Sequence, residues 1–111
     1  MTRAPWENPW AGEVTLVIDG EPRLMRLTLG ALAALEARLG ADSLVSLVAR
    51  FEDGRVGSAD VIALIAAGLS GGGTPMTEAD LAQARIEGGP MAAARAAAAL
   101  LALAFALPEP A

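Results

Sequence analysis

Alternation of apolar and polar residues is confined to the early part of the chain, where it predicts a β-hairpin. Residues 13–18 (EVTLVI) are apolar and rich in β-branched side chains, which is typical of a strand. Residues 19–22 (DGEP) follow, and Asp-Gly is among the strongest short hairpin signals. Residues 23–27 (RLMRL) then predict the return strand, although their alternation is imperfect. The two segments together predict one antiparallel hairpin.

After the hairpin, the apolar period changes from two residues to the spacing of a helix. A first helix is expected to begin after the N-cap Thr28 and to end at Gly40, because glycine commonly follows the last turn of a helix. Asp42 can cap a second helix, which Asp-Gly at 53–54 ends. The apolar stripes that predict these two helices are Leu29, Leu32, Leu35 and Leu39, followed by Leu44, Leu47, Val48 and Phe51.

Three further helices are predicted in the second half of the chain. One begins at the cap Ser58, and the glycines within residues 68–73 are expected to end it in a flexible turn. A short helix at about 78–87 follows the capping residue Thr77. A glycine pair then interrupts the chain, and a last helix begins with a proline and covers residues 90–107.

These elements predict an α+β fold, in which an N-terminal β-hairpin is followed by four to five α-helices and the chain is mostly helical. We expect an N-terminal arm at 1–12, a single domain at 13–107 and a C-terminal tail at 108–111, since 111 residues fit one domain. The apolar stretch 96–107 is too short to cross a bilayer, and the first residues lack a signal-peptide pattern. We therefore expect a soluble, cytoplasmic protein without membrane contact.

Composition argues against catalysis and against nucleic acid as a partner. The chain has no Cys and no His, so disulfides, thiolate metal sites and the usual general base near neutral pH are excluded. Its eight basic residues are all Arg and stand singly, against thirteen acids and a net charge of −5, whereas a nucleic-acid binder needs clustered positive charge. We predict no catalytic residue, no metal site and no cofactor.

Two segments resemble ligand-binding motifs but are better explained as turns and caps. Residues 70–74 (SGGGT) are glycine-rich, yet a phosphate-binding P-loop needs a Lys at fixed spacing, and the chain has none. Acidic pairs at 19/21, 52/53 and 78/80 lack the further carboxylates of a Ca²⁺ loop. Turn and helix-cap chemistry accounts for both kinds of segment.

The order of several short segments resembles a family of small proteins from gene transfer agents and related tailed phages. The resemblance covers about residues 12–72. The segments that carry it are GEV at 12–14, DG at 19–20, LTLGALAALE at 27–36, a helix end at 39–40, DV at 60–61 and AGL at 67–69.

This resemblance implies a role in building the phage-like tail. Members are described both as tail assembly chaperones and as tail tube proteins. A chaperone would bind the tape measure protein, a long and apolar helical protein, and hold it for the tail tube protein. Tube subunits resemble β-sandwiches with long hairpins, whereas this chain predicts one hairpin. We therefore favour the chaperone, with the tape measure and tail tube proteins as partners, and keep a structural tube or connector subunit as the alternative.

Trp6 and Trp10 are the two tryptophans of the chain, and both lie in the predicted N-terminal arm. Tryptophan is enriched at the centres of protein interfaces, so the arm could anchor a partner. Alternatively, both side chains fold back and cover the apolar surface of the domain itself, because soluble proteins rarely expose two large aromatics. The sequence leaves both alternatives open.

The C-terminal helix carries the remaining candidate partner residues, Met91, Leu101 and Phe105. No polar residue lies between Arg95 and Glu109, and a helix that is apolar all round must be covered on several sides. Such a helix is either the central core helix or meets a partner, which would be a second copy or an apolar helix of a client.

Overall fold

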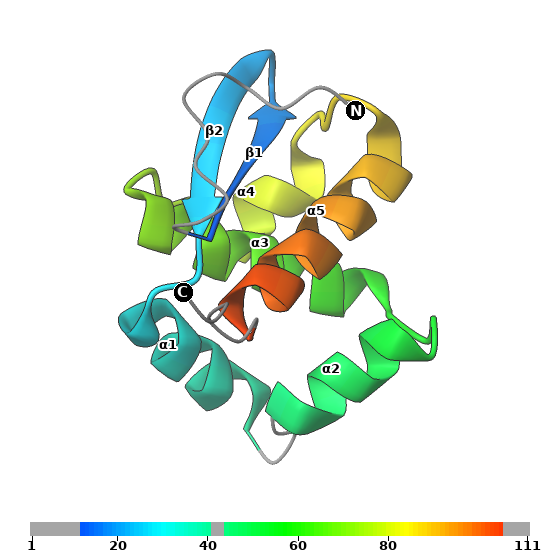
Figure 1. Ribbon diagram of the computed structural model, residues 1–111. Coiled ribbons are helices and arrows are strands. Elements are labelled where there is room, and N and C mark those ends of the chain that lie inside the picture. The colour runs from blue at the N-terminus through cyan, green and yellow to red at the C-terminus, as the bar shows by residue number, and fades with distance from the viewer. Residues whose placement is uncertain (1–11, 41–43, 106–111) are drawn as a thin grey trace, which may run out of the picture.

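The computed structural model describes residues 12–40 and 44–105. These residues form one two-stranded antiparallel sheet followed by five helices, which confirms the predicted α+β fold (Figure 1). The elements are β1 (Glu13–Ile18), β2 (Glu21–Arg26), α1 (Leu29–Leu39), α2 (Leu44–Glu52), α3 (Ser58–Gly72), α4 (Glu78–Gln83) and α5 (Gly89–Ala104).

The hairpin turn is tighter than predicted, so β2 begins two residues earlier. Asp19 and Gly20 both have positive φ, 52° and 81°, as the central residues of a two-residue turn of the favoured hand require. Glu21 therefore already pairs with β1. Pro22 lies opposite Val17 in a non-hydrogen-bonded pair of the hairpin. The backbone N–H of any other residue would point away from β1 there, so proline, which lacks this N–H, costs no hydrogen bond between the strands.

The outer edge of β1 is partly covered by a segment far along the chain. Residues 85–87 run beside it, with Asp19 N–H donating to Arg85 O at 2.8 Å and Glu87 N–H donating to Val17 O at 3.0 Å. Helix α4, predicted to reach about residue 87, stops earlier because these residues adopt extended backbone to pair with the strand.

Helix α3 continues through glycines that were expected to end it. Gly68, Gly71 and Gly72 are helical, and Gly73, with φ of 95°, is the C-cap. The predicted flexible turn is therefore wrong for these three residues. The predicted N-cap is also displaced by one position, since Gly57 precedes the helix and Ser58 is its first residue.

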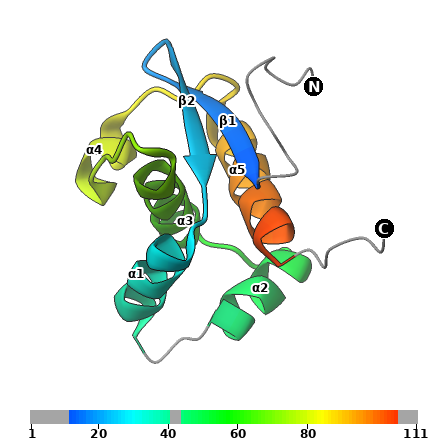
Figure 2. The same ribbon diagram turned by 60° about the vertical axis from the view of Figure 1, so that its left-hand side comes forward.

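Those glycines let α3 lie directly on the free edge of β2. A Cβ atom at Gly71 would overlap the carbonyl oxygen of Arg26, and one at Gly72 would overlap that of Leu24. At Gly68 it would overlap the side chain of Leu100 and press on Met25 in the core. Any larger residue would push the helix away, so the missing side chains are what brings the two backbones together. In Figure 2, α3 lies along β2 and α5 lies along β1.

The core lies between the inner face of the hairpin and helices α3 and α5. Six large side chains are fully buried there, and they are Ile18, Met25, Leu47, Leu64, Leu69 and Leu100. Helix α5 is a core helix, which was one of its two predicted roles, and its buried face is mainly alanine. Its solvent side carries Met91 and Arg95 in the first half and alanine, at Ala98 and Ala102, in the second half.

Two further boundaries differ from the sequence prediction. Helix α5 begins at Gly89, one residue before the proline expected at its first position, and ends at Ala104 with Phe105 as its C-cap, three residues before the predicted end at 107. The predicted cap Asp42 lies outside the described residues. In α1, Leu29 is 86% exposed although it was assigned to the apolar stripe, and the buried positions are Ala31 and Leu35. Within the described ranges, no helix has the length and apolar character to cross a membrane.

Candidate partner-binding surface

An apolar groove lies between α2 and the C-terminal end of α5. It has a volume of about 390 Å³, and five of its six lining residues are apolar. Two of them are large and exposed to solvent: Val45 at 78% and Phe105 at 49%. The lining residues are Leu44, Val45, Val48, Ala49, Glu52 and Phe105. We call this feature the α2–α5 groove.

The sequence of α2 places apolar side chains on two adjoining faces. Leu44, Leu47, Val48 and Phe51 follow the i, i+3, i+4, i+7 spacing, and Leu47 on this stripe is fully buried. Val45 and Ala49 are four residues apart and form a second row beside the first. This second row is exposed. One face therefore holds the helix on the core, and the other opens into the groove.

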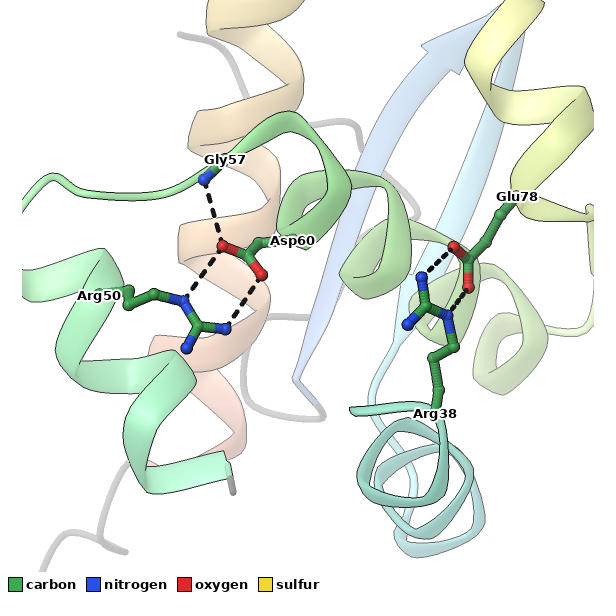
Figure 3. Close-up of polar contacts among 5 residues, drawn as sticks. All are labelled: Arg38, Arg50, Gly57, Asp60 and Glu78. Atoms are coloured by element: carbon green, nitrogen blue, oxygen red, sulfur yellow. Dashed lines mark hydrogen bonds and ion pairs between the residues drawn. The ribbon is translucent and has the colours of Figure 1, made fainter. Parts of the chain in front are cut away.

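An ion pair fixes the other side of α2 to the start of α3, as Figure 3 shows. Arg50 donates from Nε to Asp60 Oδ2 at 3.2 Å and from Nη2 to Asp60 Oδ1 at 3.0 Å. Asp60 Oδ2 also accepts the backbone N–H of Gly57 at 3.1 Å, which caps α3. The Arg50 hydrogen bonds hold the pKa of the Asp60 carboxyl below its ordinary value, although partial burial opposes this.

A second two-pronged ion pair, between Arg38 of α1 and Glu78 of α4, also appears in Figure 3. Arg38 Nε donates to Glu78 Oε2 at 2.9 Å, and Nη2 donates to Oε1 at 3.1 Å. This pair raises the pKa of Arg38. Both side chains are well exposed, so the pair contributes much less to stability than one held in the interior.

A larger and more polar hollow, of about 820 Å³, lies at the tip of the hairpin. It is bounded by the hairpin turn, by Gln83 at the end of α4 and by the segment that follows, including Glu87. Asp19 in its wall already accepts the Arg85 backbone N–H at 2.8 Å. In the part of the chain that the structure describes, no group of three His, Cys, Asp or Glu side chains is placed to hold a metal ion.

The structure separates the predicted partner residues. Phe105 lines the α2–α5 groove, whereas Met91, 67% exposed, lies at the opposite end of α5, roughly 21 Å away at 1.5 Å per residue. Leu101 is 4% exposed and packs in the core, so it is not available to a partner in this conformation. Trp6 and Trp10 lie outside the described residues.

Sequence reasoning did not select the α2 residues of the groove. The stripe that predicted this helix also explained its apolar residues as core positions. Val45 is an extra apolar residue beside that stripe, and it was the available signal for a second apolar face. The pairing of α2 with Phe105 depends on tertiary structure, because some fifty residues separate the two in the chain.

The described residues therefore offer an apolar contact surface and structural ion pairs rather than a cluster of reactive groups. Comparison with protein families matches residues 11–107 to the family described as "Phage tail tube protein, GTA-gp10". Because the match covers most of the chain, the protein belongs to this family of phage and gene transfer agent tail proteins. Neither the curated proteins nor the solved structures gave a match.

Proposed function

We propose that this protein is a tail assembly chaperone of a gene transfer agent or phage-like particle. In this role it binds the tape measure protein, tail tube subunits or both through apolar helical surface, and it performs no catalysis. It acts in the bacterial cytoplasm while the particle is assembled. Membership of a tail protein family supports the setting.

The observation that carries the proposal is the α2–α5 groove. A groove of about 390 Å³ between two helix segments, with Val45 and Phe105 on its surface, suits the apolar face of another helix. A tape measure protein is a long apolar helix that needs such cover before the tube surrounds it. The small hairpin, with just two strands among the described residues, also favours a chaperone over a β-rich tube subunit.

Co-expression with the tape measure protein of the same particle tests this function. We expect a soluble complex by size-exclusion chromatography with light scattering, with the tape measure protein insoluble when expressed alone. Val45→Glu should abolish the complex, because it places a charge in the apolar groove. Leu29→Glu is the matched control, since this residue of α1 is 86% exposed and does not line the groove, and it should leave the complex intact. A complex that survives Val45→Glu would contradict the assignment of the groove.

A structural tail tube or connector subunit is the second candidate, favoured by the family description as a tail tube protein. This function predicts that the purified protein assembles by itself into rings or tubes that electron microscopy can detect. It also predicts many copies in each purified tail. The chaperone predicts the reverse on both counts, so quantitative mass spectrometry of purified particles separates the two functions.

A further inference from the structure

Helix α5 presents a narrow stripe of exposed side chains along most of its length. The stripe consists of Met91, Arg95, Ala98, Ala102 and the C-cap Phe105. Met91 is 67% exposed and Phe105 is 49% exposed, so large hydrophobic side chains lie in water at both ends of the stripe. Figure 1 shows α5 on the outside of the molecule, with α3 behind it. We call this stripe the α5 seam.

The spacing of the α5 seam is that of a coiled coil. Its members are four, three, four and three residues apart, which is the seven-residue period that a helix follows where it lies along another helix. A straight helix drifts by roughly 20° in each such period, so over two periods the five side chains stay on one face. At 1.5 Å per residue the seam is about 21 Å long. Its geometry therefore fits one partner helix that lies along α5.

Large side chains flank small ones in the seam. Ala98 and Ala102 lie in its middle, where small side chains let the axis of a second helix approach to the lower end of the usual range of about 8–10 Å. Met91 and Phe105 offer larger apolar contacts at the two ends. Phe105 also lines the α2–α5 groove. The seam and the groove thus form one continuous and mainly apolar surface.

Arg95 gives the seam its charge. It is the single charged residue between Glu87 and Glu109. Within the described residues, Arg95 makes no ion pair and no side-chain hydrogen bond. A partner that covers this guanidinium without a carboxylate leaves a desolvated and unpaired charge, which is costly. The seam therefore selects a helix with an Asp or Glu at the point where it meets Arg95, because a carboxylate can accept two charge-assisted hydrogen bonds from arginine.

The same charge argues against a second copy of this chain as the partner. In a symmetric pair, two identical seams face each other. Arg95 then lies opposite itself in a parallel pair. In an antiparallel pair centred on Ala98, the two arginines lie about 9 Å apart along the helices, at 1.5 Å per residue. Either arrangement brings like charges together, and the seam contains no acid to compensate them.

We propose that the α5 seam is the docking site for one helix of another tail protein, a helix that has apolar residues at coiled-coil spacing and an Asp or Glu that pairs with Arg95. This inference rests on the proposed chaperone function and deepens it, because it states which kind of client segment is recognised. The apolar residues of the client supply the contact area. Its acid fixes the register of the client helix along α5.

Co-expression with the tape measure protein of the same particle tests the seam. Ala98→Glu should abolish the soluble complex that the parent forms, because it places a charge where the client helix comes closest. Ala37→Glu is the matched control, since it makes the same substitution at an exposed alanine of α1, and it should leave the complex intact. Both alanines are exposed in helices, so both variants should keep the far-UV circular dichroism and the urea midpoint of the parent.

A charge swap tests the acid of the client. When the parent and a variant compete for the same tape measure protein, intact mass spectrometry of the complex gives their relative affinities. Arg95→Glu should bind at least about tenfold more weakly than the parent, because like charges then face each other. Arg95→Lys keeps the charge and should lose less. Arg85→Glu, the control, changes the net charge equally at an exposed site near the hairpin tip and should compete as well as the parent.

The same swap identifies the facing residue in the client. Each Asp and Glu of the bound tape measure segment is changed to Lys in turn, and the complex with the parent is measured again. One of these changes should weaken the complex with the parent and be rescued by Arg95→Glu, because the two charges are then exchanged. Such a rescue is not expected of a residue whose role is only structural.

Three results would overturn the seam. One is a parent complex that survives Ala98→Glu or Arg95→Glu, which would place the client elsewhere and leave the chaperone function intact. Another is a dimer of this chain alone that Ala98→Glu dissociates, which would make a second copy the occupant. The third is a parent that forms no complex with the tape measure protein, which would overturn the chaperone function and the seam with it. The first result thus distinguishes failure of the seam from failure of the function.

Discussion

Helices α3 and α2 are held on the molecule in different ways. Helix α3 has five buried residues and touches β2 backbone to backbone, through glycines that leave no room for a side chain. Helix α2 has one buried residue, Leu47, and is otherwise held by the Arg50–Asp60 ion pair and the partly buried residues of its stripe. The hairpin, α3 and α5 thus make a tightly packed body, and α2 is attached to its side.

Helix α3 thus contributes mainly to the stability of the fold, whereas α2 offers apolar surface that the core leaves uncovered. Where α3 meets β2, a single added methyl group has nowhere to go, so that contact accepts little change. At α2 the apolar surface exceeds what the core covers, and the excess is the α2–α5 groove. The exposed apolar surface thus lies on a helix that contributes one buried residue to the core.

The largest expected effect is that of adding a side chain between α3 and β2. Gly71→Ala should destabilise the fold by about 4 kcal/mol or more, because the new Cβ would overlap backbone that cannot rotate away. Gly30→Ala is the control, since a Cβ at this helical glycine would lie 3.9 Å from Thr28 Oγ1, an ordinary contact distance, and alanine favours helix, so it should gain about 0.5–1 kcal/mol. Urea denaturation followed by circular dichroism measures both. A Gly71→Ala protein as stable as the parent would refute the close contact.

Truncating one buried leucine in each helix sharpens the comparison. Leu64→Ala in α3 should cost near the upper end of the usual range of about 2–5 kcal/mol, because the tightly packed surroundings cannot close the cavity. Leu47→Ala in α2 should cost near the lower end, since a helix attached from one side can shift inward. Both leucines are fully buried, so exposure does not explain a difference. Equal losses in urea denaturation would remove the distinction between the two helices.

Breaking the ion pair should have a smaller effect. Arg50→Met should destabilise the protein by about 1–2 kcal/mol, because it removes two charge-assisted hydrogen bonds from a partly buried carboxylate. Arg38→Met removes an equally well-formed pair at an exposed site and should change stability less. Thermal denaturation of the two variants compares the sites. A larger loss for Arg38→Met would contradict this account of α2.

The smallest expected effect is a dependence on pH. The lowered pKa of Asp60 means that its ionised form is favoured by folding. Its contribution is fully present above the ordinary Asp pKa of about 4 and is lost as the pH falls through the lower value of the folded state. The stability gap between the parent and Asp60→Asn, from urea midpoints, should therefore narrow in acid. A gap that stays constant between neutral and acidic pH would show that the carboxylate charge contributes nothing.

Periodicity and turn chemistry predicted the kinds of elements and their order. Asp-Gly at the hairpin, the Thr28 and Thr77 caps and the helical spacing of apolar residues are local signals, and each acts where it was expected. The α+β class follows from these signals alone.

The errors arose where distant parts of the chain decide the outcome. Glycine ordinarily ends helices, but at 68, 71 and 72 it makes room for β2, which lies some forty residues earlier. The sequence of residues 85–87 is compatible with the end of a helix, but in the fold their backbone pairs with β1 instead. Similarly, the groove needs Phe105 beside α2, so Val45 was not selected. Local sequence cannot indicate such contacts, because the partners are defined only after folding.

The pairing of β1 with residues 85–87 also has a consequence for synthesis on the ribosome. The Asp19–Arg85 contact spans 66 positions, which take roughly 3–13 s to translate at about 5–20 residues per second. During that interval the hairpin lacks its third backbone partner, and an isolated hairpin is only marginally stable. Glu21, Arg23 and Arg26 place charges along β2, which disfavour edge-to-edge pairing between nascent chains until the remaining helices are complete.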